Sequence, residues 1–381
     1  GLVIGLERGS ERSVLGWGRM GAAGAPAPDG DTVFEIGSVT KVFTARLLAD
    51  LIERGQAVLD DPAESLMPSG ARLPRSASGK TFTLRQLIEH SSGLPRLPGN
   101  LAPKNPADPY ADYDEALLDV FLKSHVLSRE PGSKVEYSNL GYGLLGSLLA
   151  ANAADTYGGL IQSRVAGPLG MTRTAAAWAG PMASGHDGWG APVPHWEFDA
   201  LAGAGVLRST ANDLLKFLAD TAGKPGAPMG WIEEKGAFWH NGQTGGFHSF
   251  IGFHRPSGTK VVVLANAAVA VTDIGLHLLR GSPLSVPPAP RTEIAVSTVV
   301  LDSYAGRYEL APGFILTVRR DGARLKVQAT GQQEMPVFAE SDTKFYYKAV
   351  EAALTFRVDS FGRVVGLILH QGGDLEAKRL P

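Results

Sequence analysis

The chain has 381 residues, of which 44% are hydrophobic, and its 36 basic and 38 acidic side chains give a formal net charge of −2. This length exceeds one ordinary core and predicts two domains, or one large domain with an appendage. The balanced charge argues against a nucleic-acid partner, so a small-molecule or short-peptide substrate is favoured. The absence of cysteine excludes disulfides, zinc–thiolate sites and cysteine nucleophiles. Oligomeric state is left open.

The first 20 residues predict a β-hairpin with strands over 2–6 and 14–17. No stretch approaches about 18 consecutive apolar residues, so no transmembrane segment is expected. The opening residues also lack the cationic flank of a signal peptide, as those of a mature or trimmed chain would.

Residues 34–52 contain a short apolar run, a glycine and a serine, followed by apolar residues at helical spacing. Ser38 is therefore expected at the N-terminus of a helix that ends near Gly55. Lys41 follows one turn later, so its amine can reach the serine hydroxyl and take its proton. The alternative is that Ser38 merely caps the helix, because serine is a common N-cap.

Further helices are predicted over 81–90, 114–125, 140–151 and 211–220, and strands over 247–254 and 260–266. Strands at both ends with helices between them indicate an α+β fold with one antiparallel sheet, in which the first and last strands are neighbours. The loops 95–113 and 178–204 are expected to border a cleft. Tryptophans in the second loop either line a pocket or pack on the domain surface.

Residues 281–299 are rich in proline and predict a linker between a domain over 1–280 and another over 300–381. The last part contains six short strand-like segments at regular spacing, which indicates a small all-β barrel or sandwich. It carries no obvious catalytic constellation.

Two other short motifs carry polar side chains. Tyr137 and Asn139 lie two residues apart in an extended approach to the helix over 140–151, so both side chains can point the same way. His240, Asn241 and Gly242 precede the late strands. Taken singly, each has an ordinary explanation: a half-buried tyrosine, a helix cap or a glycine turn.

Together, the motifs Ser38-Val39-Thr40-Lys41, Tyr137-Ser138-Asn139 and His240-Asn241-Gly242 resemble the three ordered motifs of the serine β-lactamase and penicillin-binding-protein superfamily. In particular, they look like the branch that contains AmpC-type β-lactamases, DD-carboxypeptidases, D-aminopeptidases and related esterases (peptidase family S12). Segments 83–95, 168–171 and 205–211 support it, and the likeness covers about residues 1 to 275. The last part is similar to the lipocalin-like barrels appended to some of these hydrolases.

This resemblance implies a serine hydrolase in which Ser38 forms an acyl-enzyme with an amide or ester and water then releases the acyl group. Either Lys41 or Tyr137 takes the serine proton, and the sequence leaves both open. Asn139 would hold Lys41 and the substrate amide. No cofactor and no metal are expected, and four histidines considered as ligands have no metal-binding spacing. These are His186, His195, His248 and His254.

The third motif would complete substrate binding. The resemblance implies that the backbone N–H groups of Ser38 and Gln243 hold the oxyanion, and that Asn241 and Gly242 bind substrate along the edge strand. His240 stands where the lactamases mostly carry lysine, and would face the substrate carboxylate or the Tyr137 hydroxyl. Because histidine is largely uncharged above about pH 7, affinity for anionic substrates should weaken as pH rises through neutrality.

Several activities fit this resemblance. The first is D-amino-acid peptidase or DD-carboxypeptidase action, with carboxylesterase action close beside it, since histidine at position 240 occurs in peptidase and esterase members. The alternatives are a β-lactamase and a non-catalytic penicillin-binding sensor or receptor. The family normally has a helix before the first strands, and none precedes Leu2, which suggests a trimmed chain. The family expectation for location is the bacterial periplasm or secretion, with the cytoplasm as the alternative.

Overall fold

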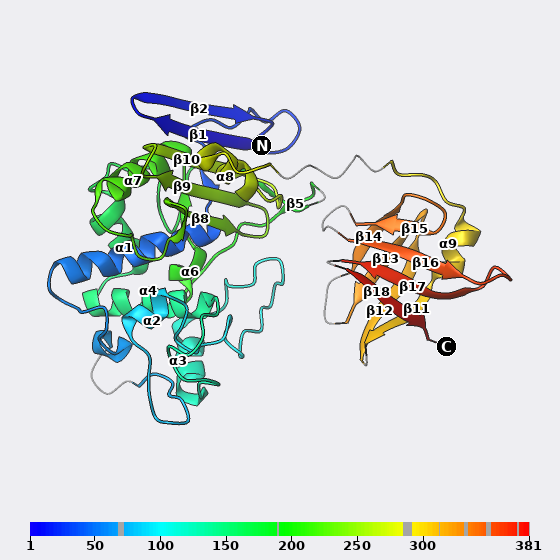
Figure 1. Cartoon of the computed structure of the whole chain (residues 1–381), viewed down its shortest axis with the longest axis horizontal. Coiled ribbons are helices and arrows are strands. Elements are labelled where there is room, and N and C mark those ends of the chain that lie inside the picture. Colours follow the sequence, from blue (N-terminus) through cyan, green and yellow to red (C-terminus); the bar gives the residue numbers. More distant parts are fainter. Residues whose placement is uncertain are drawn as a thin grey trace. The chain divides into compact units, whose positions relative to one another are not determined.

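A computed structural model describes residues 1–67, 72–188, 190–284, 292–311, 313–330, 334–347, 352–371 and 373–380 (Figure 1). Its contacts divide the chain into two compact units, Gly1–Leu284 and Ser285–Pro381. Residues 285–291 of the predicted linker and Trp189 of the second predicted cleft loop lie outside the described residues. The last two residues of the predicted linker already belong to a helix, α9 (Thr298–Tyr304).

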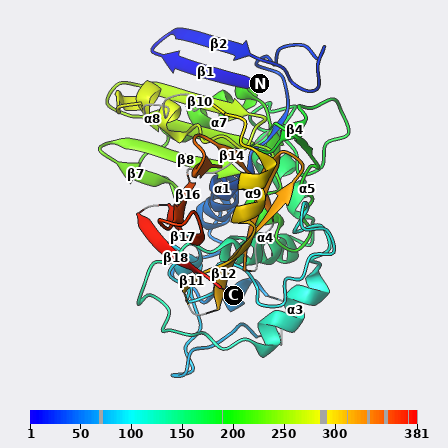
Figure 2. The same cartoon turned by 90° about the vertical axis from the view of Figure 1, so that its right-hand side faces the viewer.

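The first unit is built on a six-stranded antiparallel sheet with the order β2-β1-β10-β9-β8-β7 (Figure 2). Val3 of the first strand pairs with Leu264 of the last, which confirms the prediction that the first and last strands of this sheet are neighbours. The strands are β1 (Leu2–Arg8), β2 (Glu11–Trp17), β7 (Ile232–Glu234), β8 (Ala237–Gln243), β9 (His248–His254) and β10 (Thr259–Ala265).

Both faces of this sheet are covered, because neighbouring residues of a strand point to opposite sides. In β10, Val262 and Leu264 belong to the large core that includes α7 (Ala211–Gly223), whereas Val261 and Val263 belong to a smaller core beside α8 (Thr272–Arg280). An alternation of this kind places neighbouring residues of β8 in different environments.

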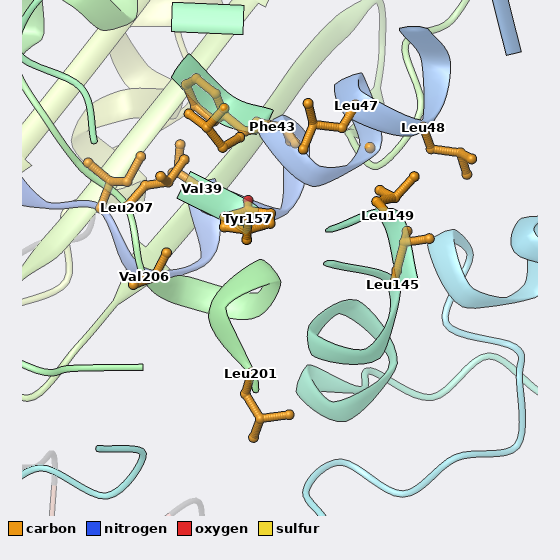
Figure 3. Packing of buried hydrophobic residues seen from close by; sticks show 14 of the residues in the cluster. Val39, Phe43, Leu47, Leu48, Leu145, Leu149, Tyr157, Leu201, Val206 and Leu207 are labelled. Carbon is orange, nitrogen blue, oxygen red and sulfur yellow. The ribbon is translucent and has the colours of Figure 1, made fainter. Parts of the chain in front are cut away.

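The remaining helices form a layer beyond α1 (Thr40–Glu53), which lies between the sheet and this layer (Figure 1). Leu47 and Leu48 of α1 lie near Leu145 and Leu149 of α4 (Figure 3), whereas Phe43 stacks on Phe217 of α7 with ring centroids 4.0 Å apart. Burial on several sides explains how a lysine of α1 can lose all contact with water. The other elements of this layer are η2 (Ala63–Leu66), α2 (Leu84–Ile88), α3 (Glu115–Ser124), α4 (Asn139–Ala153), α5 (Tyr157–Ile161), η3 (Gln162–Ala166) and α6 (Ala202–Gly205).

Two short strand pairs complete the first unit. β3 (Phe34–Glu35) pairs with β6 (Arg208–Ser209), and β4 (Gly185–His186) pairs with β5 (Pro192–Val193). The predicted helix over 81–90 is shorter than expected, because Thr83 caps it with a capping box and α2 begins only at Leu84.

The second unit contains a closed barrel of eight antiparallel strands, as expected of a lipocalin-like domain. The barrel closes where β11 pairs with β18. Two strands were not predicted: β14 contains Pro336, and β18 is mostly exposed and charged. The strands are β11 (Gly306–Ala311), β12 (Phe314–Asp321), β13 (Arg324–Ala329), β14 (Met335–Ala339), β15 (Lys344–Tyr346), β16 (Ala353–Val358), β17 (Val364–His370) and β18 (Asp374–Arg379). Across the described parts of both units, no helix is long and apolar enough to span a membrane.

Candidate active site

Ser38 lies in η1 (Gly37–Val39), a single 3-10 turn that runs directly into α1. Its side chain caps neither helix. The turn is fixed from both sides, since the N–H of Ile36 donates to the Leu207 carbonyl and the hydroxyl of Ser249 donates to the Ile36 carbonyl. Ser38 is half-buried and therefore accessible on a rigid support.

Two side chains reach the Ser38 hydroxyl. Lys41 Nζ lies 3.1 Å from Ser38 Oγ, and the Tyr137 hydroxyl donates to the same oxygen at 3.0 Å. The first contact follows from the single helical turn between the residues, as the sequence predicted. The second joins residues 99 positions apart and depends on how α4 packs against α1. The motifs of the two segments therefore converge on one oxygen atom.

The amine of Lys41 has two hydrogen-bond partners besides Ser38. Its Nζ lies 2.8 Å from Asn139 Oδ1 and 2.8 Å from the carbonyl oxygen of Ala204. Complete burial, and then the charge of Arg96, lower the pKa of Lys41 well below its usual value. A neutral amine has two hydrogens and one lone pair, so donation to both carbonyl oxygens leaves the lone pair for the proton of Ser38.

The phenol of Tyr137 is biased toward its protonated form. Burial raises the pKa of its phenol, although the hydrogen bond to Ser38 and the charge of Arg96 act in the opposite direction. The residue lies just before α4, whose N-cap is Ser138 and whose first helical residue is Asn139. The side chains of Tyr137 and Asn139 point the same way, as predicted, and Ser138 between them caps the helix.

His90, which was not predicted as a site residue, holds this segment in place. It has a left-handed backbone with φ 57°, and its Nδ1 accepts the N–H of Ser138 at 3.1 Å. Its carbonyl accepts the N–H of Glu136, and its ring packs on Tyr137 with centroids 4.5 Å apart. Burial and then the charge of Lys41 lower the pKa of His90 to about 4, so the ring is neutral near pH 7.

Gly242 brings the end of β8 against the serine turn. A Cβ atom there would lie 2.0 Å from the Ile36 carbonyl oxygen and 2.7 Å from the Ser38 nitrogen. The expected close approach is therefore made by the chain's own backbone. On the other side of the contact, Gly37 has φ +52°, and a Cβ atom there would lie 2.7 Å from the Gln243 nitrogen.

The backbone N–H of Gln243 points out of the sheet edge. The N–H of Thr244 donates to the Phe247 carbonyl, so the next pair, Gln243 with His248, occupies a non-hydrogen-bonded position of the ladder. β7 pairs with β8 only over 237–239, which leaves this outer edge uncovered by β7. The backbone nitrogens of Ser38 and Gln243 therefore lie side by side, an arrangement that suits an oxyanion.

His240 and Asn241 separate onto opposite faces of β8. His240 is 5% exposed, and its Nδ1 lies 2.6 Å from the Asn241 carbonyl oxygen. Burial, and then the charge of Lys41, lower its pKa to about 3. The imidazole is therefore already neutral throughout the neutral pH range, which removes the basis for the expected loss of anion affinity there.

The predicted substrate contact of the Asn241 side chain is not supported by its position. Its amide nitrogen donates to Thr272 Oγ1 of α8 at 3.0 Å, on the sheet face that turns away from Ser38. The cause is the two-residue period of a strand, which forces Asn241 to the side opposite His240.

Two further residues near the site come from the predicted cleft loops. The guanidinium of Arg96 lies 5.2 Å from the Tyr137 ring centroid. Tyr110 stacks on Phe198 at 4.7 Å and contacts Trp196 edge-on at 5.3 Å, which joins the loop 95–113 to the loop 178–204. Part of the second loop therefore packs into an aromatic cluster. Only the composition of the loop could be used for prediction here, and it carries no signal that singles out Arg96.

The histidines considered as metal ligands have other surroundings. His195 Nδ1 lies 2.9 Å from the buried Glu35 carboxylate, and His254 Nδ1 lies 2.8 Å from the Ser257 hydroxyl. Within the described ranges, no group of three or more His, Cys, Asp or Glu residues is placed to hold a metal ion.

Comparison with known families and proteins gives a consistent result. A family model described as Beta-lactamase matches residues 1–227, and one described as a domain of unknown function (DUF3471) matches residues 290–379. Penicillin-binding protein 4* of Bacillus subtilis (strain 168) is 24% identical over 411 residues, which cover 92% of this chain and 88% of that protein.

A second relative covers a shorter part. D-alanyl-D-alanine-carboxypeptidase/endopeptidase AmpH of Escherichia coli (strain K12) is 31% identical over 174 residues, 46% of this chain and 44% of that protein. The structure of the octameric penicillin-binding protein homologue from Pyrococcus abyssi aligns with a TM-score of 0.63 at 22% identity, covering 99% of this chain and 95% of that one. At that identity the likeness shows a shared fold.

Proposed function

The chain belongs to the β-lactamase family of serine hydrolases, and we propose that it cleaves the amide bond before a terminal D-amino acid of a short peptide through an acyl-enzyme on Ser38. The observation that carries this proposal is the convergence of Lys41 Nζ and the Tyr137 hydroxyl on Ser38 Oγ, at 3.1 and 3.0 Å. A base and an acid on one hydroxyl are what acyl transfer to serine requires.

In the proposed acylation, Ser38 Oγ attacks the scissile carbonyl carbon and its proton passes to the lone pair of Lys41 Nζ. The N–H groups of Ser38 and Gln243 hold the oxyanion. When the tetrahedral intermediate collapses, the C–N bond breaks and the leaving nitrogen takes a proton from the Tyr137 hydroxyl, which Lys41 can restore. Water then attacks the ester, and the same groups act in reverse.

The choice between Lys41 and Tyr137 as the acylation base follows from their environments. A buried, neutral lysine with its two hydrogens engaged is a ready acceptor, whereas a tyrosine with a raised pKa keeps its proton. We therefore assign the base to Lys41 and the proton donor to Tyr137. Asn139 holds Lys41, and His240 is an uncharged neighbour of the site.

The substrate class rests on the relatives. Penicillin-binding protein 4* and AmpH bear names that refer to penicillin binding and to D-alanyl-D-alanine carboxypeptidase and endopeptidase activity. A short peptide with D-amino acids fits the partly aromatic surroundings of Ser38. Such a substrate implies action in the bacterial periplasm or outside the cell.

The test compares the unaltered protein with Ser38→Ala on four compounds: an N-acylated peptide ending in D-Ala-D-Ala, its L,L counterpart, p-nitrophenyl acetate and a cephalosporin. Of the two peptides, we expect only the D,D peptide to release D-alanine. In Ser38→Ala, kcat for this release should fall by roughly 10⁴-fold or more. Turnover that persists in this variant would overturn the serine assignment.

The other activities give distinct results. Cephalosporin turnover far above peptide turnover would identify a β-lactamase, and turnover of esters alone would identify a carboxylesterase. A stable penicillin adduct on Ser38, detected by mass spectrometry without turnover of any compound, would identify a binding protein. Each of these results contradicts the peptidase proposal.

A further inference from the structure

The basic side chains around Ser38 differ in charge. Lys41, His90 and His240 are all buried, and burial is the largest cause of the lowered pKa of each. The two imidazoles are therefore uncharged at neutral pH, and burial biases the amine of Lys41 toward its neutral form. The third motif, which carries a lysine in most lactamases, here supplies no positive charge for an anionic substrate.

Arg96 is a cation beside this group, and a guanidinium stays charged at any working pH. Its side chain is exposed, and it forms no ion pair with a carboxylate among the residues that the structure describes. Its charge acts on both Lys41 and Tyr137. Arg96 therefore contributes positive charge to the groups around Ser38.

The backbone fixes the position of Arg96 relative to the catalytic groups. Its carbonyl oxygen accepts the N–H of Asn139 at 3.0 Å and the N–H of Leu140 at 3.2 Å, so the residue is tied to the first turn of α4. The guanidinium lies 5.2 Å from the ring centroid of Tyr137. Arg96 therefore belongs to the same rigid segment as the proton donor.

Tyr137 also defines the side of the site on which Arg96 lies. The proton donor must face the leaving nitrogen, so the departing group occupies the Tyr137 side of Ser38. In a C-terminal amino acid, the carboxylate carbon lies two bonds beyond that nitrogen, about 3 to 4 Å from the scissile carbonyl carbon by standard bond lengths. Arginine is well suited to bind such a carboxylate through two parallel hydrogen bonds.

We propose that Arg96 binds the carboxylate of the leaving group and makes this site selective for removal of a C-terminal amino acid over cleavage within a peptide. The inference rests on the proposed serine hydrolase function and adds the residue that recognises the carboxylate of the leaving group. In this proposal, a residue of the loop over 95–113 supplies the positive charge that the third motif lacks.

The test uses two esters that differ only in the charge of their leaving group, 3-acetoxybenzoate and 3-acetoxybenzamide. The measured quantity is the ratio of kcat/KM for the carboxylate to kcat/KM for the amide. We expect the unaltered protein to prefer the carboxylate by about tenfold or more, and Arg96→Ala to reduce this ratio to near one. Arg96→Lys should keep part of the preference, because it retains the charge without the paired donors.

Lys104→Ala is the matched control, since it removes a positive charge from the exposed part of the same loop. It should keep the ratio of the unaltered protein, and thermal unfolding should show that both variants are folded. An unaltered protein without preference, or an Arg96→Ala variant that retains it, would overturn the inference. If neither ester acylates Ser38, the proposed function itself fails, whereas Ser38-dependent turnover with a ratio insensitive to Arg96 refutes the arginine assignment alone.

Discussion

Gly242 and Ser38 are in such close contact that a Cβ atom on the glycine would lie 2.7 Å from the serine nitrogen. The same atom would lie 2.0 Å from the carbonyl oxygen of Ile36, which a relaxed structure cannot accept. The end of β8 and the serine turn therefore fit together only without a side chain at this position. Since this contact sets the two proposed oxyanion donors side by side, it links backbone packing to catalysis.

Gly242→Ala should therefore reduce activity more than stability. We expect kcat to fall by roughly 10² or more, as when an oxyanion donor is lost, and the free energy of unfolding to fall by about 1 to 3 kcal/mol. Steady-state kinetics and urea unfolding measure the two effects.

Gly223→Ala is the matched control for this prediction. It lies at the end of α7, and a Cβ atom there meets no atom within 4 Å. We expect unchanged kinetics, with stability unchanged or slightly increased. A Gly242→Ala variant with normal kcat would show that the exact approach of β8 is not needed.

Tyr137→Phe tests the proton donor, because it keeps the ring and removes the hydroxyl that lies 3.0 Å from Ser38 Oγ. We expect kcat/KM for the peptide amide to fall by roughly 10² to 10⁴. The loss should be much smaller for p-nitrophenyl acetate, whose leaving group departs as a stable anion. Equal losses for both substrates would contradict a role in leaving-group protonation.

A tyrosine-to-phenylalanine substitution in the barrel is the matched control for Tyr137→Phe. Tyr304→Phe removes a hydroxyl that donates to the Asp342 carbonyl in the second unit. Its activity should match that of the unaltered protein on both substrates. A parallel loss in this variant would point to a general effect of the substitution.

His90 is a positioning residue for Tyr137, and its variants should separate geometry from proton transfer. His90→Ala removes the acceptor for the Ser138 N–H and the ring that packs on Tyr137, so we expect kcat to fall by roughly 10- to 100-fold. His90→Asn should restore part of it, because asparagine offers an acceptor and tolerates the left-handed backbone found here, with φ 57°.

A pH profile distinguishes this role from acid–base catalysis. Since the pKa of His90 is lowered to about 4, its variants should leave the shape of the kcat/KM profile near neutral pH unchanged and lower only its height. A lost or shifted limb in this range would show that His90 transfers protons itself.

The sequence was sufficient where local spacing determines geometry. One helical turn places Lys41 beside Ser38, and the strand patterns at the two ends of the first unit predicted the pairing of β1 with β10. The meeting of Tyr137 with Ser38 required the family resemblance, because no local rule connects residues 99 positions apart.

Other features of the site depend on tertiary packing. His90 is placed by a left-handed backbone and a hydrogen bond to Ser138, and Arg96 by hydrogen bonds from its carbonyl oxygen to the first turn of α4. Neither arrangement can be predicted from the local amino-acid composition. The orientation of Asn241 was within reach of sequence reasoning, since neighbours in a strand must point to opposite faces. Its assignment to the site followed the motif and ignored that alternation.

His240 gives the first unit a specific dependence of stability on pH. Its pKa is lowered from 6.5 to about 3 in the folded chain, mainly by burial. Between these values the unfolded chain binds more protons than the folded one, so the free energy of unfolding falls as pH falls from about 6.5 toward 3. The slope from one such group is about 1.4 kcal/mol per pH unit.

His240→Gln should remove this contribution. Between pH 6.5 and 4.5, the loss of unfolding free energy should be smaller in the variant by about 2 kcal/mol, whatever the absolute stability of each protein. Urea unfolding followed by tryptophan fluorescence measures it for the first unit, because all six tryptophans precede residue 285. Equal losses in both proteins would mean that His240 accepts a proton in the folded chain as readily as in the unfolded one, which its burial beside Lys41 argues against.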